Sequence, residues 1–222
     1  MPLRKIPIVA GEIYHVFNRS VARQPIFLSS KDYNRAIECM KFYLHNNLPL
    51  RFSHYNRLPK GQKDQMSKKI KGSPHIIEVL SFCLMPNHIH FLLRSITEKG
   101  IIQFMSNFQN SYAKYFNLRT DRSGTLFQAM FKAVRIETDE QLVHVNRYIH
   151  LNPITAYIVN NIEGLENYPW SSYPVYLDSS PSFITKESVL NLFKNIPTFK
   201  KFTADQVDYQ RKLDEIKHLV FE

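Results

Sequence analysis

The sequence predicts an α+β fold, in which one antiparallel sheet carries two helices on one face. Segments with strand and helix periodicity follow one another in the order strand, helix, strand, strand, helix, strand, helix. Only the turn Met85-Pro-Asn87 separates the two middle strands, which indicates a hairpin. This split β-α-β order leaves the second face of the sheet for the last helix and for a ligand.

Strands are predicted where β-branched and aromatic residues alternate with polar ones. The four predicted strands are Ile13–Arg19, Ile76–Leu84, His88–Arg94 and Met130–Ile136.

Helices are predicted from apolar residues at helical spacing. The first begins at Ser29-Ser30, with Asp32 in its first turn, and is expected to end near Asn46-Asn47. The second spans Glu98–Phe116. Its apolar stripe consists of Ile101, Met105, Phe108, Tyr112 and Tyr115.

A third helix opens at Thr138 and Gln141, which resemble a capping box. Pro153 disfavours helical geometry at Asn152, so this helix is expected to end near Leu151.

Two domains or sub-domains are expected along the chain. Residues 7–160 would form the main domain. Residues 161–222 would form a C-terminal wrap containing Tyr168–Tyr173 and a helical extension. Short amphipathic helices are predicted in that extension near Lys186–Asn195 and Asp205–Val220.

The positive charge of the chain predicts a polyanionic partner, most often nucleic acid. The net charge is +10, and more than half of the excess lies in the basic insert 48–75. Phe52, His54 and Tyr55 lie within this insert and would suit base stacking. The insert has no clear periodicity, so a docking surface and a solvated, disordered loop are equally good interpretations.

Several classes of protein are disfavoured. No apolar run approaches the length of a membrane span, and the first residues lack the apolar stretch of a signal peptide. Two cysteines, Cys39 and Cys83, give no disulfide framework and no cysteine-based zinc site. A cytoplasmic protein is therefore expected.

His88 and His90 form the most informative pair in the sequence. Residues two apart on a strand share a face, so both imidazoles would project from the sheet while Ile89 and Phe91 enter the core. Two imidazoles on one face are typical of a metal site. The plain alternative is a half-buried strand that shows two histidines to solvent.

Tyr148 lies in the middle of a polar stripe on the third helix. Gln141, His144, Tyr148 and Asn152 are spaced by three, four and four residues, so they share one helix face. An amphipathic tyrosine at the boundary of the core is the ordinary interpretation of such a position.

Five motifs together resemble one family, the REP-associated tyrosine transposases of the single-tyrosine HUH (His-hydrophobe-His) superfamily. They fall in the family's order and cover roughly residues 7–177. The matching motifs are Tyr14-His-Val-Phe-Asn-Arg19, Met85-Pro-Asn-His-Ile-His90, Gly124-Thr-Leu-Phe-Gln128 with Phe131-Lys132, Arg147-Tyr-Ile-His-Leu-Asn-Pro153 and Trp170-Ser-Ser-Tyr173.

The resemblance implies a ferredoxin-like sheet with the catalytic helix over its open face. It implies that His88 and His90 bind a divalent metal, Mg²⁺ or Mn²⁺, that Asn152 completes the metal site and that Tyr148 is the nucleophile. The long basic insert and the chain beyond Asp178 depart from the family pattern.

The implied activity is cleavage and rejoining of single-stranded DNA at hairpin, repetitive palindromic elements through a 5′-phosphotyrosine. Candidate phosphate contacts are Arg19, Arg94, Arg119, Arg122, Lys132 and Arg135. The alternatives are a catalytically silent relative that binds hairpin DNA or RNA, and a metal-dependent hydrolase of small phosphoesters. Homodimer and monomer both stay open.

Overall fold

The computed structural model describes residues 7–207 of the chain. Four antiparallel strands form one sheet in the order β2-β3-β1-β4. They are β1 (Ile13–Arg19), β2 (Ile77–Met85), β3 (His88–Ser95) and β4 (Lys132–Ile136). This order is the ferredoxin-like one, so the predicted fold class is confirmed, and the predicted hairpin is β2–β3.

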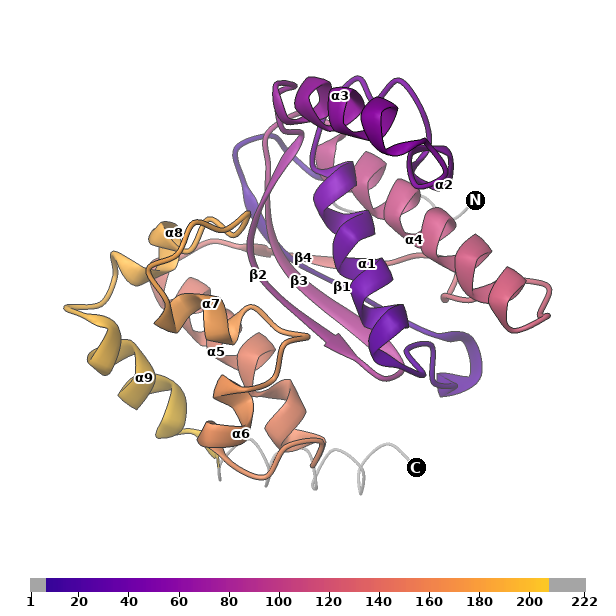
Figure 1. Cartoon of the computed structure of the whole chain (residues 1–222). Coiled ribbons are helices and arrows are strands. Elements are labelled where there is room, and N and C mark those ends of the chain that lie inside the picture. Colours follow the sequence, from indigo (N-terminus) through magenta and orange to yellow (C-terminus); the bar gives the residue numbers. More distant parts are fainter. Residues whose placement is uncertain (1–6, 208–222) are drawn as a thin grey trace.

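Two long helices, α1 (Ser30–Tyr43) and α4 (Gly100–Arg119), cover one face of the sheet (Figure 1). Their apolar stripes form the main core with the sheet. Phe91 of β3 packs its ring against Phe104 and Phe108 of α4, with centroids 5.8 and 5.6 Å apart. Burial of each such side chain stabilises the fold by roughly 1.5–3 kcal/mol.

The opposite face of the sheet is covered by α5 (Asp139–Thr155) and by the C-terminal segment (Figure 1). The Oγ1 atom of Thr138 accepts a hydrogen bond from the backbone N–H of Gln141 at 3.1 Å, so the predicted N-cap is present. The helix does not end near Leu151 as predicted. Pro153 removes one helical hydrogen bond, but the helix continues beyond it to a bond from Ala156 N to Asn152 O at 3.0 Å.

The C-terminal segment protects the edge of the sheet at β2. The hydroxyl of Tyr168 donates to the carbonyl of Leu84 at 2.9 Å, and Ser172 N donates to the carbonyl of Phe82 at 2.9 Å. Paired edges of this kind cannot recruit another chain. Short helices follow along this segment, namely α6 (Ile162–Glu166), α7 (Tyr173–Leu177), α8 (Glu187–Leu190) and α9 (Ile196–Ala204).

Two predictions about the C-terminal extension need correction. The helix expected near Lys186–Asn195 is only the four residues of α8, and α9 was not predicted. The helix expected at Asp205–Val220 lies almost wholly outside the described residues. None of the helices within residues 7–207 combines the length and apolarity that a membrane crossing requires.

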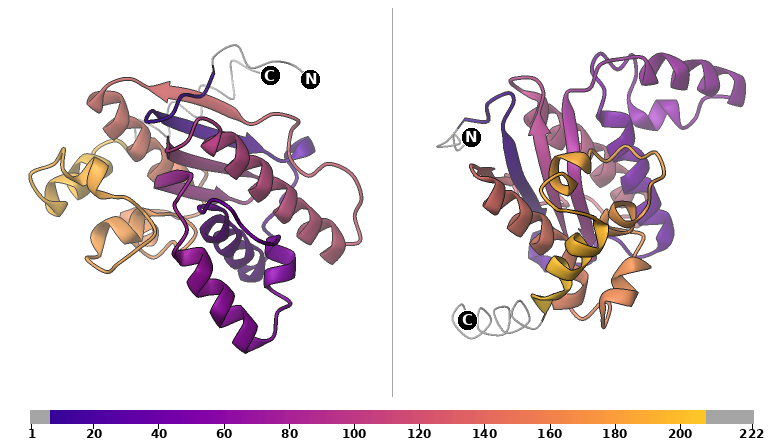
Figure 2. Two further views of the ribbon diagram at one scale, coloured as in Figure 1. Left: turned by 90° about the horizontal axis from the view of Figure 1, so that it is seen from above. Right: turned by 90° about the vertical axis from the view of Figure 1, so that its left-hand side faces the viewer.

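The basic insert is folded, so the disordered-loop interpretation is wrong. It forms α2 (Phe52–Tyr55) and α3 (Lys60–Lys71), and α3 projects beyond the end of the sheet (Figure 2). Phe52 is 2% exposed and packs between α1 and the insert, so it cannot stack on a base as predicted. The first helix ends at Tyr43, slightly before the predicted end.

Asp32 of α1 forms hydrogen bonds both to α4 and to the loop that precedes α1. Its carboxylate is fully buried and accepts hydrogen bonds from Leu28 N, the hydroxyls of Ser29 and Tyr115, and the guanidinium of Arg119. Burial alone would raise the pKa of Asp32, but these hydrogen bonds outweigh it and lower the pKa below its usual value.

Replacing Asp32 with Asn is expected to lower the free energy of unfolding by about 2 kcal/mol at neutral pH. Because the folded-state pKa is lowered, this stabilisation is present above the unfolded pKa and is lost as pH falls below about 4. Urea unfolding at pH 7 and pH 3 measures both effects. Asp64→Asn, at an exposed position on α3, is the control. A penalty for Asp32→Asn that is equal at both pH values would contradict this account.

Candidate active site

Alternation along β1 and β3 presents one set of side chains to α5. The register pairs Phe17 with His90 and Arg19 with His88, so these four residues lie on the same face of the sheet. The ring of His15, two residues before Phe17, stacks on His90 with centroids 5.2 Å apart. The strand therefore positions the predicted histidine pair beside a third histidine.

Tyr148 of α5 meets this cluster. Its ring lies edge-on to His90 at a centroid distance of 5.6 Å and edge-on to His15 at 5.9 Å. The side chain is half-buried. The structure thus brings together the tyrosine and the imidazole pair, which are about sixty residues apart in the sequence.

Asn152 lies one helical turn after Tyr148 and reaches His88. Its amide nitrogen donates to the carbonyl of Tyr148 at 2.8 Å. A side-chain hydrogen bond also links Asn152 to His88, and the Nδ1 of His88 lies 2.6 Å from the Oδ1 of Asn87. The continuation of α5 past Pro153 is what holds Asn152 in this direction.

Burial keeps the histidines neutral at physiological pH. It lowers the pKa of His88 to about 4, an effect to which Arg19 adds, and it lowers the pKa of His15 to about 4. The pKa of His90 falls well below its usual value, first through burial and then through His88 and His15. Neutral imidazoles are the form that binds metals.

The two stacked histidines share a hydrogen bond of 3.0 Å between His15 Nε2 and His90 Nδ1. One of the two nitrogens must carry the proton. When His90 donates through Nδ1, its Nε2 keeps a lone pair, and this is the tautomer in which Nε2 can bind a cation. Ligating histidines usually donate their other ring N–H to such a partner.

The donor set fits a divalent cation. His88 and His90, with ring centroids 5.0 Å apart, supply imidazole nitrogens, and Asn152 supplies an amide oxygen. Mn²⁺ accepts both kinds of donor, and Mg²⁺ prefers the oxygen. Within residues 7–207, no group of three or more His, Cys, Asp or Glu side chains is arranged to hold a metal. The amide of Asn152 would therefore have to serve as the third protein donor.

The six basic residues predicted to contact phosphate are not all beside this cluster. Arg19 is paired with His88 in the register, and Lys132 lies over the ring of Phe17, with its Nζ 5.9 Å from the centroid. The other four are engaged elsewhere.

Three of these four form ion pairs. Arg94 binds Glu78 at 2.6 Å, Arg135 binds Glu12 at 2.8 Å, and Arg119 binds Asp32. The fourth, Arg122, donates to the side chain of Asn117 and to the carbonyl of Thr125.

Two residues of the cluster were not singled out from the sequence. His15 and Phe17 alternate on β1, within the segment Ile13–Arg19. The signal that could have found His15 is the strand register, because it places the histidine opposite Leu92 and next to His90.

Comparisons with known proteins show what this chain is similar to. Residues 61–152 match the family model described as IS200-like transposase. No curated protein matches the chain.

Among solved structures, a REP-associated tyrosine transposase bound to a REP hairpin is similar to this chain. It is 14% identical, with a TM-score of 0.50, over 80% of this chain and 86% of that one. A second structure, described as a candidate transposase from Deinococcus radiodurans R1, is 12% identical over 67% of this chain and 95% of that one, with a TM-score of 0.37.

At 14% identity the first structure supports the fold alone. The family match includes the strand that carries His88 and His90, and it continues along α5 as far as Asn152. The match covers less than half of the chain, and over residues 61–152 the chain is similar to the IS200-like transposases.

Proposed function

We propose that this protein is a transposase that cleaves and rejoins single-stranded DNA at hairpin elements, with Tyr148 as the nucleophile. The observation that supports the proposal most directly is the contact of the Tyr148 ring with His90 and His15. A phenol held against a pair of neutral imidazoles has no evident purpose in a protein that only binds DNA.

Tyr148 would attack the scissile phosphorus with its hydroxyl oxygen. The new bond is a 5′-phosphotyrosine, the bond to the 3′ oxygen breaks, and the phenol's proton is balanced by the proton taken up by the leaving 3′-OH. The 3′-OH of another strand can reverse the step, which joins DNA without a nucleoside triphosphate. A covalent intermediate of this kind suits strand transfer better than hydrolysis.

Free tyrosine has a pKa near 10, so at neutral pH it is mostly protonated and a weak nucleophile. Cleavage therefore depends on activation of the phosphodiester that it attacks. His88, His90 and Asn152 would hold a divalent metal, Mg²⁺ or Mn²⁺, which when bound polarises a phosphate oxygen and orients the scissile bond. Neutral imidazoles at the base of the site are suited to this task because they need not lose a proton first.

Arg19, Lys132 and Phe17 are positioned to hold the strand near Tyr148. The two cations lie on the same face of the sheet as the histidine cluster. The Phe17 ring is stacked on His90 and tilted against His15. A single strand, with its accessible phosphates and bases, can reach these groups. The similar REP-associated transposase is bound to a hairpin, which favours a hairpin beside the cleavage point.

Tyr148→Phe is expected to abolish a covalent protein–DNA adduct while leaving DNA binding within about twofold, because only the attacking oxygen is removed. Labelled hairpin DNA with a single-stranded flank, incubated with Mn²⁺ and run on a denaturing gel, measures the adduct. The control is Tyr157→Phe, at an exposed tyrosine just beyond α5. Binding without an adduct in the wild type would favour the silent DNA-binding alternative, and cleavage that survives Tyr148→Phe would favour the hydrolase.

His88→Ala and His90→Ala are expected to weaken Mn²⁺ binding at least tenfold, on the order of what loss of a ligand costs, and to abolish the adduct. Hairpin binding should stay close to that of the wild type. Calorimetric titration with Mn²⁺ alone, in the absence of DNA, measures the affinity. His54→Ala, at an exposed histidine on α2, is the control. Unchanged Mn²⁺ affinity in both variants would rule out a metal at these residues.

His15→Phe is expected to weaken Mn²⁺ binding by about tenfold, because His90 loses the partner that sets its tautomer. His15→Asn keeps an acceptor and should retain more of the affinity than His15→Phe. The same titration with Mn²⁺ measures both variants. Equal affinity in His15→Phe and the wild type would show that His15 packs against the site without orienting His90.

A further inference from the structure

The folded insert builds two hollows on the side of the sheet away from Tyr148. One hollow lies between α1, α2 and α4, and the other lies between α1, α3 and the loop at Pro181–Phe183. Asn56, at the end of α2, lines both. The insert contributes lining residues to both hollows, and the chain beyond Asp178 contributes to the second.

The first hollow, called here the cationic hollow, has a volume of about 690 Å³. Its charged lining residues are Arg35, Arg51, Arg57 and Lys114, and no Asp or Glu is among the described residues that line it. Asn107, Asn110 and Ser111 of α4 add hydrogen-bonding groups. A concave surface with cations of one sign attracts an anion more strongly than a flat one.

Arg35 is fixed at the base of this hollow. Its guanidinium carbon lies 4.1 Å from the centroid of the Phe52 ring and 5.2 Å from that of Tyr115. Its Nε is buried and has no hydrogen-bond partner among the described groups. Asp32, one turn earlier on α1, is already paired with Arg119 and does not neutralise Arg35. The cationic hollow therefore keeps its positive charge available to a ligand.

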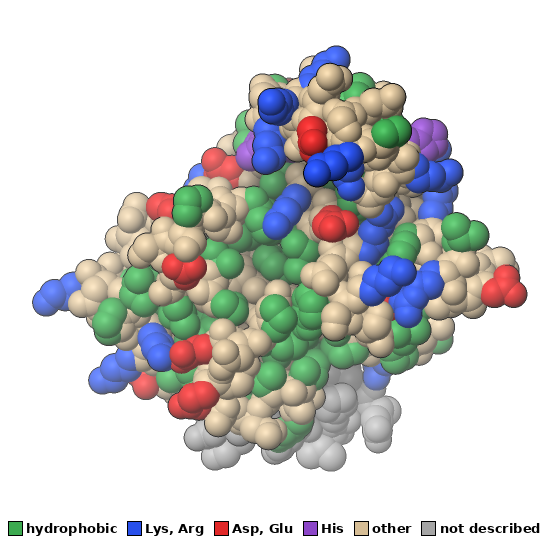
Figure 3. Space-filling view, in the orientation of Figure 1, with side chains coloured by type: hydrophobic (Ala, Val, Ile, Leu, Met, Phe, Trp, Pro, Cys, Tyr) green, Lys and Arg blue, Asp and Glu red, His purple; other side chains and the backbone are tan. Residues whose placement is uncertain are grey.

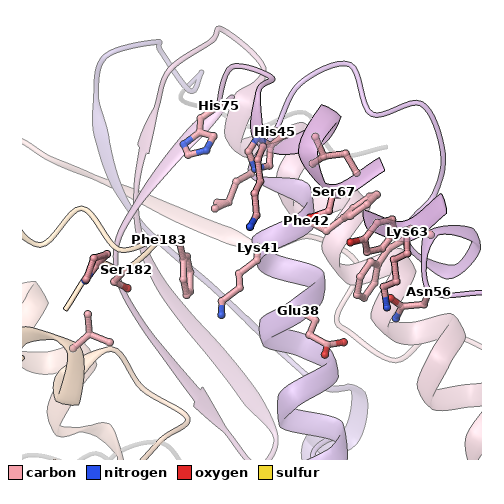
Figure 4. A pocket seen from close by; sticks show the side chains of 17 residues that line it. Glu38, Lys41, Phe42, His45, Asn56, Lys63, Ser67, His75, Ser182 and Phe183 are labelled. Carbon is pink, nitrogen blue, oxygen red and sulfur yellow. The ribbon is translucent and has the colours of Figure 1, made fainter. Parts of the chain in front are cut away.

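The second hollow, called here the aromatic pocket, has a volume of about 840 Å³ (Figure 4). Phe42, Tyr55 and Phe183 line it, and Lys41 and Lys63 place their ammonium groups over two of these rings. The Nζ of Lys41 is 5.1 Å from the Phe183 centroid, and the Nζ of Lys63 is 5.2 Å from the Tyr55 centroid. Glu38 is the one acid among the described residues that line it.

Aromatic faces beside lysines are the features with which proteins bind an unpaired base together with its phosphate. The surface view shows that this region is richer in basic side chains than the C-terminal helices are. Lys and Arg gather over the insert and the adjoining helices, whereas over α7–α9 basic and acidic side chains alternate (Figure 3). A second polyanion-binding surface is thus separated from the first by the thickness of the sheet.

We propose that the cationic hollow and the aromatic pocket together bind a second stretch of single-stranded DNA, which lies beyond the part held at Tyr148. Phosphates occupy the cationic hollow, and an unpaired base enters the aromatic pocket past Asn56. The choice of DNA as the ligand rests on the proposed function, but the surface itself does not use Tyr148, His88 or His90. It raises the affinity for long substrates and leaves the cleavage chemistry unchanged.

The double variant Arg57→Gln with Lys114→Gln tests the cationic hollow, since both side chains are exposed and their replacement leaves the core intact. It is expected to bind a hairpin carrying a long single-stranded flank about tenfold more weakly at low salt, and to lower the slope of log affinity against log salt by about 1. The control, Lys194→Gln with Lys201→Gln, removes the same charge near α9, on the far side of the molecule (Figure 1). Fluorescence anisotropy over a salt series measures both.

The aromatic pocket has a separate test. Abasic spacers in the flank are expected to weaken wild-type binding by about tenfold, the contribution of one stacked base. In Phe183→Ala this difference between natural and abasic flanks should largely disappear. Equal wild-type affinity for both flanks would overturn the aromatic pocket as a base-binding site.

A short hairpin without the flank separates this proposal from the proposed function. Arg57→Gln with Lys114→Gln should form the Tyr148 adduct on the short hairpin at the wild-type rate, which also shows that the variant is folded. Tyr148→Phe should bind the long flank like the wild type. If the double variant binds the long flank as tightly as the Lys194 and Lys201 control does, the second surface does not exist, whatever the outcome for the adduct.

Discussion

The two-residue alternation of β3 is the constraint on which the whole arrangement depends. Ile89 and Phe91 lie in the core, where Phe91 packs against α4. Because side chains alternate along a strand, His88 and His90 must point to the opposite face. A shift of one residue in the pairing of β3 would exchange the two sets and bury the imidazoles among phenylalanines. The same packing that stabilises the fold therefore fixes where the chemistry lies.

Burial then determines the protonation state of the histidines on that face. The helix α5 covers the histidines and removes them from water, so their pKa values fall and they stay neutral. Neutral imidazoles offer lone pairs, so a cation that bound here would meet no competing protons at neutral pH. The cost of burying polar rings is offset by the hydrogen bonds among His15, His90, His88 and Asn152.

The strands and the sheet could be predicted well because apolar and polar residues alternate along a strand that buries one face. It also predicted that Tyr148 and His90 would meet, although through a family resemblance and not through periodicity. It failed where tertiary contacts decide the structure. Met66 and Ile70 are the apolar residues of α3 that pack against the core, and two residues are too short a stripe to reveal a helix. Phe52 is buried by Phe42 and Tyr43 from α1. His15 could not be chosen without the register that brings it to His90.

The two edges of the sheet differ in their pairing. The β2 edge is paired with the C-terminal segment through Ser171 and Ile184. On the other side, no described strand pairs with the outer edge of β4, and Val134, opposite His15 in the register, is 55% exposed. Lys132 and Val134 are therefore exposed residues of β4 on the face that carries the histidine cluster. A strand that enters there and must also reach the insert has to pass around the sheet, which is why only long substrates would engage both surfaces.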